Sequence, residues 1–293
     1  MYSRRSFILI TGIGGAGIQP AMSNAADKPQ RIVSLSPDLT EILYGIGAFN
    51  RVVGVSNYDT YPPEVAKLPR LGELHSPSLE KLIGLRPDLV IVNSAQAPFL
   101  EDTLNALGLR ILKTSIGSLQ EVYGSMIAIG HATGNESEAA RLVAATREGL
   151  DRIARKTLRL PKSRVLLIID RTPGTLRDLY TATDGSFLAE LVVIAGGRLV
   201  ATPVEKGYKK LSKEDLLATD PDIILDFIQG PKSRFAGDPM EAWREMPELK
   251  AVRTKRVYGV NEDFVPHASQ RIVQTAELFA GLIHPEVPHP EAR

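Results

Sequence analysis

The sequence predicts an α/β protein of two lobes, each with a central, mainly parallel sheet flanked by helices, joined by one long connecting helix. Three observations lead to this prediction. Short β-rich runs alternate with helical patterns in both halves of the chain, which is typical of parallel sheet. One pattern of residues occurs once in each half, and a long helical stretch without proline lies between the halves.

The composition is that of an ordinary globular protein, and it excludes several classes of function. The 293 residues, 43% of them hydrophobic, suit two domains of modest size. Lys and Arg number 35 against 34 Asp and Glu, so no basic field favours nucleic-acid binding. Cysteine is absent, which excludes disulfides, thiolate nucleophiles, cysteine zinc sites and a lipid anchor on an N-terminal cysteine.

Residues 1–26 are predicted to be an export signal of the twin-arginine type. Arg4 and Arg5 precede an uncharged, glycine-rich apolar run at 7–18, and small residues at 23–25 suit a signal peptidase. A general secretory signal that happens to carry two arginines is the alternative. We therefore expect a periplasmic protein with no membrane-spanning segment after signal cleavage.

The N-terminal lobe is expected to comprise residues 27–134. Ser36-Pro37-Asp38, directly after the first β-rich run, reads as the capped start of a helix. Strands are expected at 31–35, 52–56, 89–93 and 110–114, and helices at 38–45, 79–85, 99–107 and 119–131.

The connecting helix is expected at residues 135–160. Alanine and leucine alternate with charged residues from 136 to 158, Gly149 is the weak point, and Pro161 ends the pattern. At ~1.5 Å per residue this stretch reaches ~30 Å, enough to bridge two lobes.

The C-terminal lobe is expected to comprise residues 161–285, followed by a flexible tail at 286–293. Strands are expected at 165–170, 223–227 and 256–260, and helices at 186–195, 213–219 and 269–283.

The repeated segment occupies residues 78–91 and 212–225, at an offset of 134 (221 minus 87, from the two Pro-Asp pairs). In each copy a serine caps a helix, a glutamate follows in the first turn, leucines form the core face, and Pro-Asp launches a buried strand. The glutamates are Glu80 and Glu214. A generic helix–turn–strand unit used twice is the simpler reading, but the identical positions indicate two lobes of related fold.

Several pieces of the sequence, each weak alone, together resemble one known family. They are residues 31–43 (RIVSLSPDLTEIL), 54–58 running on to 61–63, both glutamate segments, 186–191 leading to Gly196-Gly197, and 268–272. The sequence resembles the periplasmic binding proteins that serve ABC importers of iron–siderophore complexes, heme and cobalamin.

The resemblance implies a monomeric binding protein and not an enzyme, with no cofactor of its own. It implies that a metal chelate is held in the cleft between the lobes. It also implies that Glu80 and Glu214 dock onto arginines of the two permease subunits; glutamates that only favour the helix dipole are the alternative.

The ligand is expected at the carboxyl ends of the strands, where open α/β sheets bind their ligands. Arg171 could grip carboxylate or catecholate oxygens, Tyr58 could stack on a flat ligand or bind ferric iron, and His267 could supply a polar contact. For each, a purely structural role is the alternative. The candidate ligand-binding residues are Ser36, Tyr58, Tyr61, Asn93, Arg171, Tyr180, Asp263, Phe264 and His267.

The chelate is expected to be an iron–siderophore first, with corrinoid and heme next. Cobalamin binders of the family typically carry tryptophans in the cleft, whereas Asn93 stands at the position resembling one here. The only tryptophan, Trp243, lies in a charged, loop-like region.

Two rival functions remain. A Zn or Mn receptor would need three or four His, Asp or Glu ligands, and only His75 and His267 are placed to help. An exported enzyme is the distant alternative, because no Gly-x-Ser-x-Gly, His-Glu-x-x-His or phosphate-binding loop occurs; the glycine cluster at 12–17 lies inside the signal.

Overall fold

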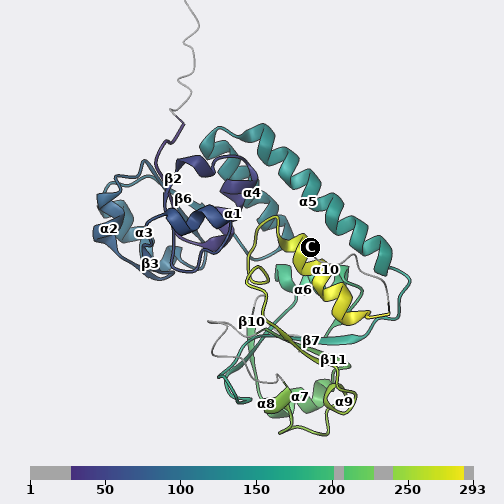
Figure 1. Ribbon diagram of the computed structural model, residues 1–293. Helices are drawn as coiled ribbons and strands as arrows, with labels where there is room; N and C mark the ends of the chain where they lie inside the picture. The colour runs from purple at the N-terminus through teal and green to yellow at the C-terminus, as the bar shows by residue number, and fades with distance from the viewer. Residues whose placement is uncertain (1–27, 201–207, 228–239, 287–293) are drawn as a thin grey trace, which may run out of the picture.

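The structure is a computed structural model that describes residues 28–200, 208–227 and 240–286. The predicted signal at 1–26 and almost all of the predicted tail lie outside these residues. Figure 1 shows two lobes with the long helix α5 running alongside both. The predicted fold class is confirmed.

The N-terminal lobe is built on a four-stranded, fully parallel sheet in the order β2-β1-β5-β6. Its strands are β1 (Ile32–Ser34), β2 (Val52–Gly54), β5 (Leu89–Asn93) and β6 (Ile111–Thr114). Its helices are α1 (Pro37–Gly45), α2 (Leu79–Gly84), α3 (Ala97–Ala106) and α4 (Leu119–Thr133), with short helical turns at Phe49–Arg51 and Pro63–Lys67. A small antiparallel hairpin joins β3 (Gly72–Glu73) to β4 (Ser76–Pro77).

The C-terminal lobe has a six-stranded mixed sheet in the order β10-β8-β7-β11-β12, with β9 also paired to β7. The strands are β7 (Arg164–Asp170), β8 (Leu179–Ala182), β9 (Arg198–Leu199), β10 (Tyr208–Leu211), β11 (Ile223–Phe227) and β12 (Val257–Val260). The helices are α6 (Phe187–Ile194), α7 (Lys213–Thr219), α8 (Met240–Trp243), α9 (Lys250–Arg253) and α10 (Ile272–Ile283). β8 is antiparallel to β7 and β10, and the sequence analysis found neither β8 nor β10.

The connecting helix α5 (Glu136–Thr157) lies within the expected range. Acidic residues stand in its first turn and Arg155 and Lys156 in its last, which suits the helix dipole at both ends. Its buried side, which includes Ala139, Leu150 and Ile153, belongs to one apolar cluster that runs from the N-terminal sheet to the C-terminal sheet. The lobes therefore share a continuous core, which favours a fixed orientation over a freely opening hinge.

The outer face of each sheet has its own smaller core. On the N-terminal lobe it includes Val33, Val90 and Val92, and on the C-terminal lobe Leu166 and Trp243. The central parallel strands β1, β5 and β11 are thus covered on both faces, as parallel sheet requires. Within the described ranges, none of the helices is both long and apolar enough to cross a membrane.

Candidate ligand-binding site between the lobes

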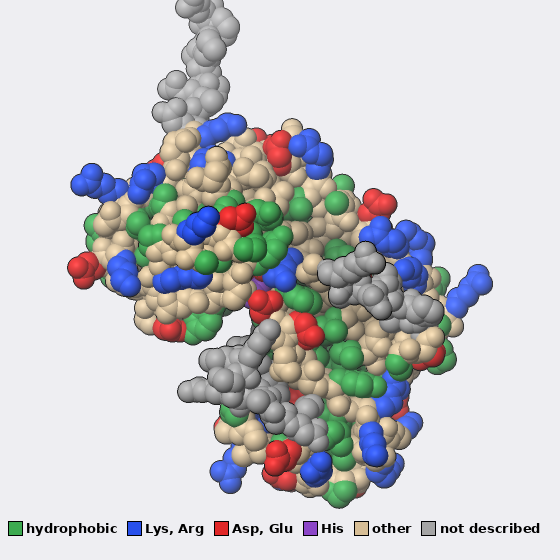
Figure 2. Space-filling model, viewed as in Figure 1, with side chains coloured by type: hydrophobic (Ala, Val, Ile, Leu, Met, Phe, Trp, Pro, Cys, Tyr) green, Lys and Arg blue, Asp and Glu red, His purple; other side chains and the backbone are tan. Residues whose placement is uncertain are grey.

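Four of the candidate residues lie at or after the carboxyl ends of parallel strands, two in each sheet. Ser36 follows β1 and Asn93 ends β5, while Arg171 follows β7 and Asp263 follows β12. Figure 2 shows an indentation between the two lobes. Open α/β sheets bind ligands at this edge, so the junction of the lobes is the candidate site.

A buried glutamate of the N-terminal lobe is the centre of the contact between the lobes. Glu41, on α1, accepts from the Nδ1 of His267 at 2.8 Å and from Nη1 of Arg271 at 2.8 Å. The hydroxyl of Ser269 also donates to it, and its backbone carbonyl accepts from the amide of Gln270 at 2.7 Å. Glu41 is 1% exposed, so this charge is fully removed from water and balanced from the other lobe.

Arg271 lies between two aromatic rings, one from each lobe. Its guanidinium carbon is 4.7 Å from the centroid of Tyr61 and 4.8 Å from that of Phe264. Asp263, whose carboxylate is 3.7 Å from Arg271, accepts a hydrogen bond of 2.6 Å from the hydroxyl of Thr60 in the opposite lobe. Three of the predicted site residues, Tyr61, Asp263 and Phe264, therefore meet around one arginine.

His267 is the candidate residue with the most defined chemistry. Burial on its own would lower the pKa of His267, but the hydrogen bond and charge of Glu41, with the charges of Asp38 and Asp263, raise it overall. Because Nδ1 is held by Glu41, the other ring nitrogen, Nε2, is left for a partner. Nε2 has no hydrogen bond to any residue in the part of the chain that the structure describes.

Ser36 and Asn93 are buried and serve the architecture of the N-terminal lobe. The amide of Asn93 donates to the hydroxyl of Ser36 at 3.2 Å, and its oxygen accepts from the backbone of Ala95 and Gln96. The hydroxyl of Ser36 donates to Asp38, whose other oxygen, Oδ2, is buried with no hydrogen-bond partner among the described residues. Burial raises the pKa of Asp38, against the lowering effect of the Ser36 bond.

The two remaining tyrosines are open to solvent. Tyr58 is 49% exposed, and its hydroxyl donates to Glu73 on the small hairpin. That hydrogen bond, followed by burial, raises the pKa of Tyr58, which disfavours the phenolate needed to bind ferric iron. Tyr180 lies on the antiparallel strand β8 and is also exposed.

Arg171 differs from the open cleft arginine that the sequence suggested. Its guanidinium is buried in an ion pair with Asp226 on β11: Nε lies 2.9 Å and Nη2 2.9 Å from Oδ2. Trp243 donates from Nε1 to the same oxygen at 2.7 Å. Trp243 is fully buried on α8, so its placement in a charged loop was wrong; a charged neighbourhood in sequence gave no sign of the buried indole.

The two glutamates predicted to dock onto a permease lie on the surface, at corresponding places. Glu80 is in the first turn of α2, capped by Ser78, and Glu214 is in the first turn of α7, capped by Ser212. Both side chains are exposed. Backbone and Ser212 hydrogen bonds at the helix N-terminus lower the pKa of Glu214, so it is anionic at neutral pH.

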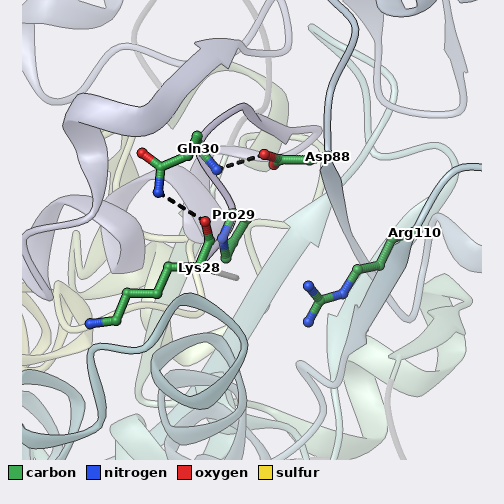
Figure 3. Close-up of a pocket in the computed structure, with 5 residues that line it drawn as sticks. All are labelled: Lys28, Pro29, Gln30, Asp88 and Arg110. Atoms are coloured by element: carbon green, nitrogen blue, oxygen red, sulfur yellow. Dashed lines mark hydrogen bonds between the residues drawn. The ribbon is translucent and has the colours of Figure 1, made fainter. Parts of the chain in front are cut away.

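A separate pocket of about 320 Å³ lies at the opposite edge of the N-terminal sheet, where the strands begin. Figure 3 shows Gln30 donating from its backbone to Asp88 in this pocket, with Lys28, Pro29 and Arg110 around it. Its position at the amino ends of the strands places it away from the junction of the lobes.

Two residues that organise the site, Glu41 and Arg271, were not predicted from the sequence. Both lie inside pieces used for the resemblance, at 31–43 and 268–272. A usable signal was the position of Glu41 three residues after Asp38 on a helix whose other side chains are mostly apolar, because a buried acid needs a partner.

Across the described ranges no group of three or more His, Asp and Glu residues could hold a metal ion, so the cluster that a Zn or Mn receptor requires is not found there.

Comparisons with known proteins agree with this architecture. A family model described as periplasmic binding protein matches residues 32–264. The chain is 31% identical over 264 residues to an uncharacterized ABC transporter substrate-binding lipoprotein, YvrC, of Bacillus subtilis, covering 88% of this chain and 81% of that protein. It is 26% identical over 261 residues to a vitamin B12-binding protein of Vibrio cholerae, covering 89% and 91%.

A solved structure supports the same relationship. The periplasmic heme-binding protein RhuT of Roseiflexus, in its apo form, superposes with a TM-score of 0.76 at 25% identity, covering 87% of this chain and 98% of that one. The chain belongs to the periplasmic binding protein family. The family resemblance is confirmed, and the proteins of this family are binding components of ABC importers and not enzymes.

Proposed function

We propose that this protein binds a metal-centred tetrapyrrole, a corrinoid or heme, in the cleft between its lobes and delivers it to an ABC importer. The observation that carries the proposal is the imidazole of His267, held through Nδ1 by Glu41 with Nε2 left unbonded by the described residues. Relatives named for vitamin B12 and heme support this class of ligand. On this support we rank the tetrapyrroles ahead of the iron–siderophore that the sequence alone ranked first.

The surroundings of His267 suit a flat ligand with charged or amide side groups. Tyr61 and Phe264 each have one ring face against Arg271 and are only partly buried, and Arg271 and Asp263 supply a cation and an anion. When neutral, the Nε2 of His267 can bind a metal centre; when protonated, it can donate to an anionic group of the ligand. Arg171 contributes by holding Asp226 rather than by touching ligand.

Absorbance titration tests the ligand. The purified chain is titrated with hydroxocobalamin, cyanocobalamin, hemin and a set of ferric siderophores, and a one-to-one spectral change is expected with a tetrapyrrole. Absorbance is preferred because the single tryptophan is buried in the C-terminal lobe. A response to ferric siderophores alone would replace the tetrapyrrole by a siderophore, and no response to any compound would overturn the chelate-binding proposal.

Variants of the site test the role of His267. We expect His267→Gln to abolish the ligand-induced spectral shift and Glu41→Gln to weaken binding about tenfold, because the imidazole loses its orienting partner. His131→Gln, at an exposed histidine on α4, is the matched control and should bind normally. An unchanged spectrum for His267→Gln would show that the metal is bound elsewhere.

Delivery is proposed to use Glu80 and Glu214 as two anionic contacts for a permease of two subunits. The double variant Glu80→Arg and Glu214→Arg is expected to abolish uptake by cells while ligand affinity stays within twofold. Glu148→Arg, on the exposed side of α5, is the control. Equal loss of ligand affinity would assign the two glutamates to folding or to the cleft.

The location is proposed to be the periplasm, reached by the twin-arginine route. Replacing Arg4 and Arg5 together by lysine is expected to block export, because that pathway requires the arginine pair. Export that continues unchanged, and that depends instead on the general secretory channel, would contradict the twin-arginine route.

A further inference from the structure

An exposed aliphatic side chain accompanies each of the two docking glutamates. Ile83 is 48% exposed on α2, and Leu217 is 46% exposed on α7. They stand at the same offset of 134 residues that relates Glu80 to Glu214. Among the described residues the other exposed leucine, isoleucine and valine side chains are Leu107, Ile127, Leu158 and Val193, and no two of these share that offset.

Geometry places each aliphatic side chain beside its glutamate. Glu80 and Ile83, like Glu214 and Leu217, are three residues apart on one helix, and residues at this spacing are neighbours on one face. The opposite face of each helix is anchored in the core by Leu82 and Leu216, both fully buried. Each lobe therefore presents one carboxylate and one apolar side chain, side by side, on a helix that its core holds in place.

The two surfaces lie on different lobes, each away from the connecting helix. Figure 1 shows α2 and α7 at the ends of their lobes that are distant from α5. The lobes share one continuous core, so the separation of the two surfaces is fixed. A partner that touches both must repeat the same recognition twice, at a fixed spacing.

One exposed aliphatic side chain is ordinary on a protein surface, but a pair repeated at the offset of the two glutamates calls for an explanation. Charge alone gives steering and orientation but little affinity at exposed sites, whereas an apolar contact next to a charge excludes water from it. The same pair of chemistries on both lobes indicates one partner surface that contains a cation beside an apolar socket, present twice.

We infer that Ile83 and Leu217 are apolar contacts of the importer's permease, each seated in a socket beside the cation that receives Glu80 or Glu214. The inference rests on the proposed docking function and deepens it. The chemistry of the two surfaces defines the proposed partner. It is a membrane permease of two like subunits, each with a basic residue next to an apolar depression.

Site-specific photocrosslinking tests the contact in the cells that make this protein. A photoreactive amino acid is placed singly at Ile83, Leu217, Glu80 and Glu214, and at the control positions Ile127 and Val193, which are 45% and 54% exposed on other helices. Crosslinked membrane proteins are identified by mass spectrometry. We expect the permease subunit at the four test positions and at neither control.

The outcomes separate the two proposals. Permease capture at Glu80 and Glu214 without capture at Ile83 and Leu217 would overturn the apolar contact and leave docking intact. No capture of a permease at any of the four positions would overturn the docking function itself. Capture of a second copy of this chain at Ile83 or Leu217 would replace the permease contact by self-association.

A binding measurement gives the size of the effect. With the captured permease purified in nanodiscs, we expect Ile83→Asp and Leu217→Asp each to weaken association about tenfold, the loss expected for removing an interface contact. Ile127→Asp should change the Kd less than twofold. Unchanged Kd for both test variants, with unchanged ligand binding and circular dichroism, would overturn the inference.

Discussion

The two lobes repeat the junction between helix and strand almost bond for bond. In the N-terminal lobe Asp88 accepts the backbone N–H of Arg31 at 3.0 Å, and in the C-terminal lobe Asp222 accepts that of Arg164 at 2.7 Å. Each arginine in turn donates to carbonyls at the end of the helix that precedes the aspartate, at Leu85 in one lobe and at Thr219 and Asp220 in the other. The two lobes differ, however, in the charged side chains that they bury.

The difference in buried charge is seen at a matching position of the two sheets. At the position of Val92 in the outer core of the N-terminal lobe, the C-terminal lobe has Asp226, fully buried and paired with Arg171. The N-terminal lobe buries Asp59 instead, and the carboxylate of Asp59 receives a hydroxyl bond from Ser56 at 2.5 Å while Arg70 donates to backbone carbonyls beside it. The local junction is therefore duplicated, whereas the burial and pairing of charged side chains is particular to each lobe.

The largest effect should follow from breaking the buried pair of the C-terminal lobe. We expect Arg171→Leu to lower the free energy of unfolding by about 3–5 kcal/mol, because Asp226 then remains as a buried charge with only Trp243 as donor. Adding Asp226→Val, the residue type of the N-terminal lobe, should restore at least half of the loss. Urea denaturation measures both.

Arg177→Leu, at an exposed arginine of the same lobe, is the control for that experiment and should stay within about 0.5 kcal/mol. A loss below about 1 kcal/mol for Arg171→Leu would contradict the account of the buried pair.

The next effect concerns pH and the N-terminal lobe. Burial raises the pKa of Asp59 to about 6, against the lowering effects of Ser56 and Arg70. The folded state therefore holds a proton that the unfolded state releases near pH 4, so the stability from this group is full below about pH 4 and is lost as the pH rises through 6. Two pKa units correspond to about 3 kcal/mol at most.

Asp59→Asn should remove this pH dependence, so the variant gains stability over the natural protein between pH 4.5 and 7.5 in urea denaturation. Asp178→Asn is the contrasting control: its exposed carboxylate bonds Lys210 and Thr172, which lowers its pKa, so any contribution is lost as the pH falls. Parallel curves for Asp59→Asn and the natural protein would disprove the pKa shift.

The duplicated junction allows a smaller, paired test. Arg164 is half-buried and Arg31 is exposed, so we expect Arg164→Ala to cost about 1–2 kcal/mol and Arg31→Ala about 0.5–1 kcal/mol. Both changes remove charge-assisted bonds to carbonyls at a helix end. Thermal denaturation of the two variants in parallel compares the lobes, and a larger cost for Arg31→Ala would contradict the role of burial.

The smallest effect concerns the helix caps. Ser212 and Asp215 form a reciprocal capping box on α7, whereas α2 has Lys81 at the matching position and only the serine cap. We expect Lys81→Asp to stabilise the chain by about 0.5 kcal/mol and Asp215→Lys to destabilise it by a similar amount. Opposite melting-temperature shifts check this, and shifts of the same sign would show that other contacts of Lys81 dominate.

Sequence patterns predicted best the elements that local chemistry bounds. Prediction and structure agree to the residue for the strands β5 and β11 and for the helix α7. A serine cap begins α7, as it begins α2, and a Pro-Asp pair precedes each of the two strands. The helix expected from 269 begins at Ile272 instead, since Ser269 and Arg271 turn toward Glu41. The strands β8 and β10 escaped prediction because their place depends on antiparallel pairing, of β8 with β7 and of β10 with β8, which no local pattern marks.

The candidate site was predictable in outline only. The rule that ligands bind at the carboxyl ends of strands brought Tyr61, Asp263, Phe264 and His267 into the prediction. The structure joins the first three around Arg271 and bonds His267 to Glu41. Their roles toward a ligand stay predictions. Glu41 and the Arg171–Asp226 pair could not be found in this way, because each bond joins residues more than fifty positions apart.

The sequence by itself determined the two lobes, their duplicated helix–strand junction with Glu80 and Glu214, and the long helix between them. These features depend on hydrogen bonds and apolar spacing within a few residues of one another. The packing of the folded chain sets which buried charges are balanced: Glu41 joins the lobes, and Arg171 neutralises Asp226. The physical reason is that a buried carboxylate is stable only with a partner in contact, and the fold alone brings distant partners together.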